Sequence, residues 1–300
     1  PYDAFMLEDD GRVDEKIFNE YTSLSLRYPP RFSQVSTEEE ALMLLANIPF
    51  DLVICMPGIG DNDAFSIGRH IKACYSHLPI VVLTPFSHGI TKRIANEDLS
   101  AFDYIFCWLG NTDLLLSIIK LIEDKMNLEH DVAEVGVQLI LLVEDGIRFY
   151  SSVLPNLYKF VLKQSQEFST EALNAHQRTL RMRGRPKIVL ARTYEEATEI
   201  YYRYKNNVLG VITDVRFPRQ GKKDALAGIK LCDEIRREDP FIPLIIQSSE
   251  ADNAAYASKY GASFIDKNSK KMDVDLRQTV ADNFGFGDFV FRNPDTLEKI

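Results

Sequence analysis

The stretch that decides the fold is Leu139-Ile-Leu-Leu-Val-Glu-Asp145, an apolar run that ends in two carboxylates. A run this short and this rich in branched aliphatic side chains is typical of a strand buried on both faces, as in a parallel sheet. Charged residues directly after such a strand lie at the carboxyl edge of the sheet, where open α/β sheets bind ligands. The stretch therefore predicts an α/β domain with a polar site at the end of this strand.

Four more apolar runs follow at a spacing that leaves room for helices between them. These predicted strands are residues 187–190, 208–212, 243–246 and 262–265, and the predicted helices between them are residues 194–204, 227–238 and 253–259. The alternation is typical of parallel βαβ units with helices on both faces of one sheet. We therefore expect a compact, doubly wound, five-stranded domain over residues 137–290.

The first half of the chain repeats this alternation with weaker signals. Strands are predicted at residues 31–35, 51–55, 80–83 and 103–106, and helices at 37–46, 65–74 and 113 to about 125. The first strand of this half is either residues 4–7 or a segment upstream of Pro1, and we favour the second. Residues 127–136 are acidic and lack apolar periodicity, so the boundary is placed there, with the first domain over residues 1–130.

Length and composition agree with two soluble domains. The chain has 300 residues, 45% hydrophobic and 26% charged, and a net charge of −9 that disfavours nucleic acid and anionic lipid as partners. No apolar run is long enough to span a membrane and no signal peptide opens the chain, so we expect a cytoplasmic protein without membrane association. Because the chain begins at Pro1, we expect a fragment. The four cysteines lack CxxC spacing and lie in apolar runs, as packed, reduced thiols do.

Chemically active side chains follow the predicted strands of the second half. Glu144 and Asp145 end the first strand, Asp214 the third, Ser248 the fourth and Lys267 the fifth. Close carboxylates repel one another unless a cation lies among them, and an all-oxygen cluster suits Mg²⁺. An aspartate, a metal, a hydroxyl and a lysine are the groups that phosphoryl transfer uses. A single aspartate here would more often be a turn or helix cap, so the joint placement is what indicates chemistry.

These motifs resemble the receiver domain of two-component response regulators, in the family's order, over about residues 137–285. The matching segments are Leu-Leu-Val-Glu144-Asp145, Asp214-Val-Arg-Phe-Pro218, Pro243-Leu-Ile-Ile-Gln-Ser248-Ser249 and Gly261-Ala-Ser-Phe264-Ile-Asp-Lys267. The resemblance implies a flavodoxin-like fold in each half, with a central five-stranded parallel sheet in the strand order 2-1-3-4-5.

The resemblance also implies a role for each site residue. Asp214 would be the phosphoacceptor, and Glu144, Asp145, Asp214 and the backbone carbonyl of Arg216 would bind Mg²⁺. Ser248 would follow the phosphoryl group, Lys267 would be its counter-ion and Phe264 an aromatic switch, although a phenylalanine on a strand is as often a core residue. The implied partners are a histidine kinase or phosphotransfer protein and an output domain or partner protein, with a homodimer left open. The module itself would not be an enzyme.

The first half resembles a receiver without its chemistry. Met56 stands at the acceptor position, and its thioether can neither accept a phosphoryl group nor bind Mg²⁺ well. Cys107 stands at the lysine position and Trp108 at that of the following proline, whereas Thr84 is kept. The acidic run at residues 8–10 is then loop or helix-start charge. We expect a pseudo-receiver that serves in packing or interaction.

The crossover after the first strand of the second half is unusually long. It exceeds the length that a βαβ unit needs by roughly twenty residues, and the excess lies at about residues 162–186. Its end is basic, with Arg178, Arg181, Arg183, Arg185 and Lys187 and no acid among them. We expect a solvated, partly mobile extension of the first helix, with a docking or anion-binding arm as the alternative.

Three classes of function remain. The first is a phosphorylated receiver module, and a weaker resemblance of residues 17–30 to the N-terminal regions of phosphoenolpyruvate synthase-like proteins suggests an enzyme as its output. The second is a Mg²⁺-dependent phosphohydrolase of the haloacid dehalogenase type. That family expects a second aspartate two residues after the nucleophile, where this chain has Arg216, so it is disfavoured. The third is a scaffold whose domains only bind partners.

Overall fold

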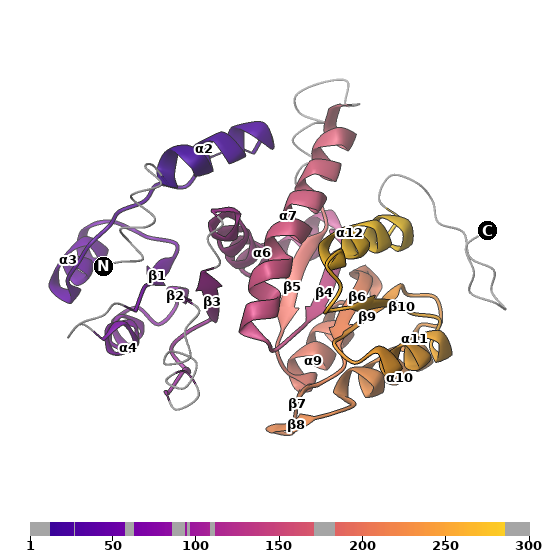
Figure 1. Cartoon of the computed structure of the whole chain (residues 1–300). Coiled ribbons are helices and arrows are strands. Elements are labelled where there is room, and N and C mark those ends of the chain that lie inside the picture. Colours follow the sequence, from indigo (N-terminus) through magenta and orange to yellow (C-terminus); the bar gives the residue numbers. More distant parts are fainter. Residues whose placement is uncertain are drawn as a thin grey trace. The chain divides into compact units, whose positions relative to one another are not determined.

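The computed structural model describes residues 13–26, 28–57, 63–85, 94, 97–108, 112–170 and 184–285. The chain forms two compact units, which are described separately (Figure 1). Unit 1 comprises residues 1–122 and 147–155, and unit 2 comprises residues 123–146 and 156–300. The division falls within helices α6 (Asp113–Val135) and α7 (Ile147–Thr170), so each of these helices contributes residues to both units.

Unit 2 contains a five-stranded parallel sheet. Its strands are β4 (Leu139–Val143), β5 (Lys187–Ala191), β6 (Val208–Asp214), β9 (Leu244–Ser248) and β10 (Ser263–Asp266). The spatial order is β10-β9-β6-β4-β5 and every neighbouring pair is parallel. Counted along the chain this is 2-1-3-4-5, so the predicted flavodoxin-like order is confirmed for unit 2. In this order the connections leave β4 and β6 in opposite directions, which opens a crevice at the carboxyl ends of these strands.

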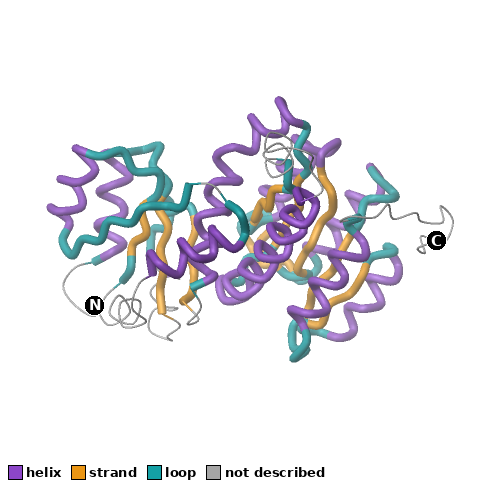
Figure 2. The backbone as a smooth tube through the Cα atoms, turned by 90° about the horizontal axis from the view of Figure 1, so that it is seen from above, coloured by secondary structure: helices purple, strands orange, loops and turns teal. Residues whose placement is uncertain are grey.

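Helices cover both faces of this sheet (Figure 2). Alternate residues of β4 pack into the cluster formed with α9 (Tyr194–Tyr204), α10 (Ala227–Glu238) and α11 (Ala254–Lys259). The intervening Ile140 and Leu142 are equally buried and face the other side of the sheet. Helix α12 (Met272–Asn283) follows β10. Two short 3₁₀ turns, Lys205–Asn207 and Ala251–Asn253, complete these connections.

A two-stranded hairpin follows β6 directly. Its strands are β7 (Phe217–Arg219) and β8 (Lys222–Asp224), which pair antiparallel. The two turn residues between them, Gln220 and Gly221, have φ angles of 52° and 71°. Positive φ at both central residues is what a type I′ hairpin turn requires. The sequence analysis did not predict this hairpin.

Unit 1 has a smaller parallel sheet than expected. Its elements are α2 (Val13–Ser23), α3 (Glu38–Asn47), β1 (Val53–Cys55), α4 (Ala64–Cys74), β2 (Ile80–Pro85) and β3 (Tyr104–Trp108), with the strand order β1-β2-β3. The predicted five-stranded sheet is therefore wrong for the described residues. Residues 31–35 form no strand, because they are exposed and follow two prolines, which cannot donate ladder hydrogen bonds. Residues 4–7 lie outside the described part.

Helix α6 extends well past its predicted end near residue 125 and reaches Val135. The sequence analysis placed a linker at 127–136, where it found no apolar period. Leu128 is nevertheless buried in the core cluster of unit 2, and Val132 packs against the same cluster. Two apolar side chains four residues apart lie on one helix face, and this short stripe is enough to continue the helix.

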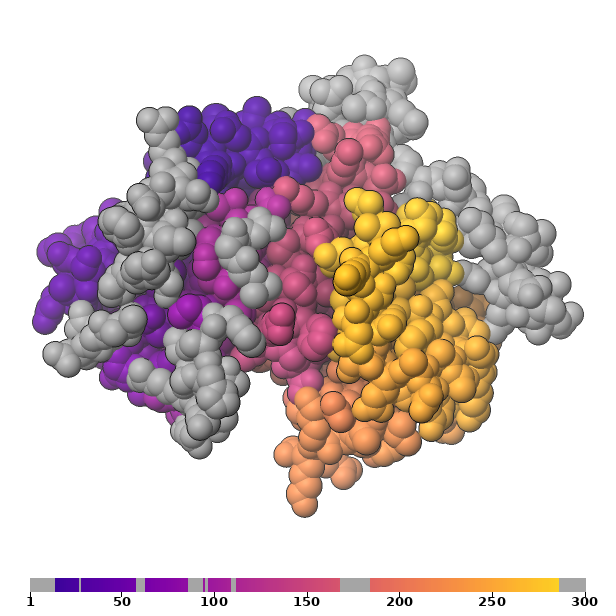
Figure 3. Space-filling model, in the orientation of Figure 1, coloured from indigo at the N-terminus to yellow at the C-terminus, as the bar shows by residue number. Residues whose placement is uncertain are grey.

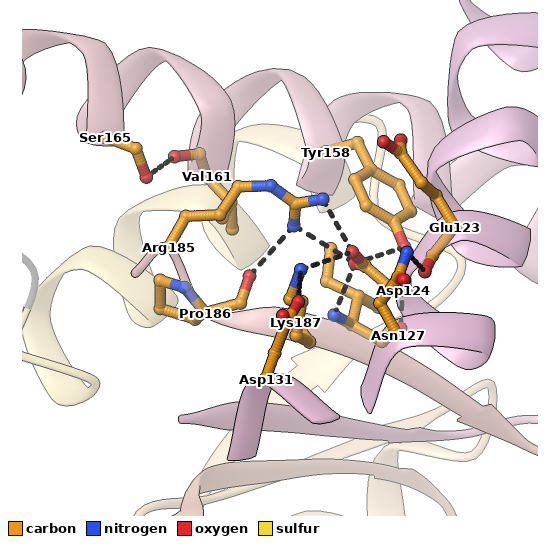
Figure 4. Close-up of polar contacts among 11 residues, drawn as sticks. Glu123, Asp124, Asn127, Asp131, Tyr158, Val161, Ser165, Arg185, Pro186 and Lys187 are labelled. Carbon is orange, nitrogen blue, oxygen red and sulfur yellow. Dashed lines mark hydrogen bonds and ion pairs between the residues drawn. The ribbon is translucent and has the colours of Figure 1, made fainter. Parts of the chain in front are cut away.

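The end of the basic segment is buried in unit 2, which contradicts the expectation of a solvated extension. Arg185 and Lys187 are each 7% exposed, and Arg185 forms a two-pronged ion pair with Asp124, with Nη2–Oδ1 and Nη1–Oδ2 distances of 2.6 and 3.0 Å (Figure 4). Lys187 Nζ lies 2.7 Å from Asp131 Oδ2. The basic segment contains no acidic residue of its own, and its acidic partners lie on helix α6, far away in the sequence. Arg178, Arg181 and Arg183 lie outside the described residues.

Asp124 is fully buried at the centre of this network. Besides Arg185, its Oδ2 accepts hydrogen bonds from the Tyr158 hydroxyl and the Ile188 backbone N–H, each at 3.0 Å (Figure 4). A buried carboxylate is tolerated only when it is paired and hydrogen-bonded in this way. The network therefore joins α6 and α7 to the start of edge strand β5.

The cysteines form no disulfide. Cys55, Cys107 and Cys232 are buried, as the sequence predicted, whereas Cys74 is exposed at the last residue of α4. Within the described ranges, every helix is too short or too polar to cross a bilayer.

Candidate functional site

Three carboxylates meet at the carboxyl edge of the unit 2 sheet. Glu144 and Asp145 follow β4, and Asp214 is the last residue of β6. These strands are neighbours, with Val143 paired to Thr213, so their ends lie at the same height. One carboxylate oxygen from each of the three residues lies within 4.8 Å of the others. The strand order thus brings together the acidic residues that the sequence singled out.

Lys267 lies between two of these carboxylates. It follows β10 and its Nζ is 2.5 Å from Glu144 Oε2 and 3.0 Å from Asp214 Oδ1. Its side chain is only 3% exposed, so the ammonium group has exchanged water for these two partners. Such a buried cation stabilises the cluster only because its charge is compensated by both carboxylates.

Glu144 is the most buried carboxylate of the three. Burial raises its pKa to about 7, and the charge of Asp214 raises it too, whereas Lys267 and a hydrogen bond from the Gly146 N–H oppose the shift. The Gly146 N–H donates to Glu144 Oε1 at 2.9 Å. The three carboxylates therefore repel one another when all are ionised, and an added cation would reduce this repulsion.

The backbone around Asp214 is tightly packed. Asp214 Oδ1 accepts a hydrogen bond from the Val215 N–H at 2.7 Å. Gly228, at the second position of α10, donates its N–H to the Val215 carbonyl at 3.0 Å. A Cβ on Gly228 would lie 1.9 Å from the Asp214 carbonyl oxygen. Only glycine permits this approach, and the sequence analysis missed its role although a glycine in the first turn of a helix is a detectable signal.

Ser248 ends β9, the neighbour of β6, and is 4% exposed. Its Oγ accepts hydrogen bonds from Asn253 Nδ2 at 2.8 Å and from the Glu250 N–H at 3.0 Å. Both contacts use the oxygen as acceptor, which fixes its position and leaves the hydroxyl proton as the group to donate. Asn253 was not identified from the sequence, because it acts through Ser248 from a short 3₁₀ turn.

Phe264 and Arg216 occupy the flanks of the site. Phe264 lies on β10, is partly buried and packs against the core cluster. Arg216 follows Asp214 by two residues, and its exposed guanidinium lies 3.7 Å from Glu250 Oε1. The partial burial of Phe264 fits either a switch or a packing role for its ring.

A second lysine, which the sequence analysis missed, reaches the outer side of the cluster. Lys223 Nζ of β8 lies 2.6 Å from Asp145 Oδ2. With Glu144 ionised, three carboxylates and two ammonium groups leave a net charge of −1 (−3 and +2). All ligand atoms are oxygens, the donor set that a hard cation such as Mg²⁺ prefers. The acidic triad therefore fits such an ion, held by few protein ligands with water completing its shell.

Among the residues that the structure describes, the corresponding strand ends of unit 1 carry no such charges. Met56 follows β1 and is partly buried, and Cys107 lies in β3 with Trp108 as the last strand residue. Burial raises the pKa of the Cys107 thiol, although the charge of Arg148 opposes this, so the thiol is neutral at pH 7. Thr84 is buried in β2. The acidic residues 8–10 lie outside the described part.

Comparisons with known proteins add a likeness in structure, not in sequence family. No family model matches the sequence, and no curated protein matches it. Among solved structures, a response regulator receiver domain protein from Clostridium thermocellum is similar, with 22% sequence identity and a TM-score of 0.34. The match covers 49% of this chain and 94% of that one. The flavodoxin-like fold of unit 2 is established by its own strand order and parallel register.

Proposed function

We propose that unit 2 is a receiver-type module that accepts a phosphoryl group on Asp214 and thereby switches its interactions. The observation that carries this proposal is the position of Lys267 Nζ, 3.0 Å from Asp214 Oδ1 and enclosed beside the acidic triad. A solvated acidic patch would not need a buried lysine. A carboxylate that receives a phosphoryl group does need one, because charge develops on the transferring oxygens.

The chemistry follows from this arrangement. Asp214 Oδ attacks the phosphorus of a phosphohistidine or a small phosphodonor in line, a new O–P bond forms, and the donor leaves with the electron pair of its own bond to phosphorus. The product is an acyl phosphate. Glu144, Asp145, Asp214 and the carbonyl of Arg216 would hold Mg²⁺, which when bound offsets the charge of the transferring group. Lys267 offsets that charge from the opposite side.

Ser248 and Phe264 would convert the modification into a change of surface. The Ser248 hydroxyl, whose oxygen is already fixed by two hydrogen bonds, donates a hydrogen bond to a phosphoryl oxygen. Phe264 repacks on the adjacent strand, and the balance between two arrangements of the β9–β10 face shifts. A histidine kinase or phosphotransfer protein would supply the phosphoryl group, and an output domain or partner would recognise the new face. Unit 1, which lacks the acceptor and the lysine, would serve in packing or interaction.

Beryllium fluoride with Mg²⁺ tests the proposal, because it mimics a phosphoryl group on aspartate. Amide hydrogen exchange between Ser248 and Lys267 should change in the wild-type chain and stay unchanged in Asp214→Asn. Asp275→Asn, the same substitution at an exposed position of α12, serves as the control and should respond like the wild type. An equal response in Asp214→Asn, or none in any protein, would favour the scaffold over the receiver.

A further inference from the structure

The β7–β8 hairpin is an addition next to the site that the function proposed above does not use. It follows Asp214 after two residues, and it projects from the lower edge of unit 2 in Figures 1 and 3. Its antiparallel register pairs Pro218 with Lys223. The type I′ turn fixes the twist of its two strands, so the direction of each side chain is set by the backbone.

The hairpin is anchored at three points. Phe217 is fully buried in the core cluster. The Gln220 N–H donates to Glu195 Oε1 of α9 at 2.9 Å, and Asp224 Oδ2 lies 2.6 Å from Lys230 Nζ of α10. Contacts at the base, the tip and the end of the hairpin hold its strands in place. Lys223 is therefore presented to the site by a fixed element, and its ion pair loses less side-chain entropy than a pair between two flexible surface residues.

The contact of Lys223 is with a residue that the proposed function assigns to the metal. Its Nζ lies 2.6 Å from Asp145 Oδ2, and its side chain is 53% exposed, so it can leave toward solvent. Lys267, in contrast, is 3% exposed and is bound to Glu144 and Asp214. The two lysines divide the triad into an inner pair and an outer carboxylate, and the outer carboxylate already carries a cation.

Resting on the function proposed above, we infer that Lys223 competes with Mg²⁺ for Asp145, so that the hairpin sets the metal affinity of the site and the Lys223 side chain turns toward solvent when the metal binds. An ammonium group 2.6 Å from a ligand oxygen lies where a cation bound to that oxygen would repel it. Lys223 is a positioning residue in this scheme, because it acts on the metal through Asp145.

Mg²⁺ titration of the full chain by calorimetry tests the inference in four proteins. Lys223→Gln should bind Mg²⁺ about two- to fivefold more tightly than the wild type, the size expected for losing one partly exposed ion pair. Lys223→Arg keeps the charge and should retain the wild-type affinity. Lys222→Gln removes the same charge from the adjacent position, whose side chain points to the other face of β8, and should have little effect.

The outcomes separate this inference from the function on which it rests. Equal affinities in all four proteins would overturn the competition and leave the receiver proposal standing, as would weaker binding by Lys223→Gln. No binding in any of them would overturn both.

Discussion

The two units place different side chains at the same kind of sheet edge. In unit 2, β6 ends in Asp214 and β10 is followed by Lys267, whereas in unit 1 β1 is followed by Met56 and β3 contains Cys107. Both sheets are parallel, and the strands that lead to both edges are mostly apolar. The difference shows that a parallel sheet only positions a possible site at its edge. The chemistry of that site depends on the few residues at the ends of the strands.

Charge compensation explains why these residues must come as a set. Lys267 Nζ lies 3.0 Å from Asp214 Oδ1 and 2.5 Å from Glu144 Oε2 in a nearly buried site, so removing the lysine leaves two carboxylates without their shared cation. The thioether of Met56 and the thiol of Cys107 are uncharged, so these side chains of unit 1 need no charged partner. The comparison therefore predicts that single substitutions disable unit 2 but do not activate unit 1.

The largest expected effect is on whether each unit is phosphorylated at all. With acetyl phosphate and Mg²⁺, the wild-type chain should gain one phosphoryl adduct by intact-mass measurement, and Met56→Asp should still gain only one. The neutral thiol of Cys107 cannot offset charge on a phosphoryl group transferred to the new carboxylate. A second adduct, mapped by peptide mass spectrometry to the region of residue 56, would show that a carboxylate at this edge is sufficient.

The next effect is on stability. Lys267→Met leaves Glu144 and Asp214 without their shared ammonium group, and breaking a buried ion pair in this way costs about 3–5 kcal/mol. The matched Cys107→Ala in unit 1 removes one small buried group and should cost about 1 kcal/mol. Urea denaturation followed by circular dichroism measures both, and the fluorescence of Trp108, the single tryptophan, reports unit 1 separately. Similar losses from both variants would contradict the importance of charge compensation.

The smallest effect compares two helix glycines. A Cβ on Gly228 would meet the Asp214 carbonyl oxygen at 1.9 Å, and a Cβ on Gly68 of α4 would meet the Phe102 ring at 2.3 Å. Each alanine variant should lose about 1–3 kcal/mol of stability through overpacking. Only Gly228→Ala displaces the backbone of Asp214, the proposed phosphoacceptor, so only this variant should slow phosphorylation by acetyl phosphate, by about tenfold to a hundredfold. An equal rate in both variants would show that the acceptor tolerates the shift.

The sequence predicted the buried sheet of unit 2 well because its strands have a simple signal. Strand β4 matches the predicted residues 139–143, and β6 begins at the predicted Val208. These runs are buried on both faces, so nearly every residue in them is apolar. Residues 31–35 contain only two strand-favouring side chains, Phe32 and Val35, and all five residues are exposed, so this stretch forms no strand.

The candidate site was only partly predictable for a related reason. Glu144, Asp145, Asp214, Ser248 and Lys267 each end a strand, so the strand pattern located them. Lys223 and Asn253 come from a charged hairpin and a short turn, which have no apolar period to reveal them. The buried end of the basic segment was missed because its acidic partners, Asp124 and Asp131, lie on a helix more than fifty residues earlier in the chain.

The Asp124 network has a consequence for how unit 2 opens. Its contacts join residues 34 and 61 positions apart, on α6, α7 and the start of β5, so no single element can satisfy the buried carboxylate by itself. An edge strand usually frays first and exchanges its amide protons fastest. Fraying of β5 would take Arg185 and the Ile188 N–H away from Asp124 and leave a bare charge in the interior. The edge of this sheet is thereby coupled to two helices, and the three elements open as one cooperative unit.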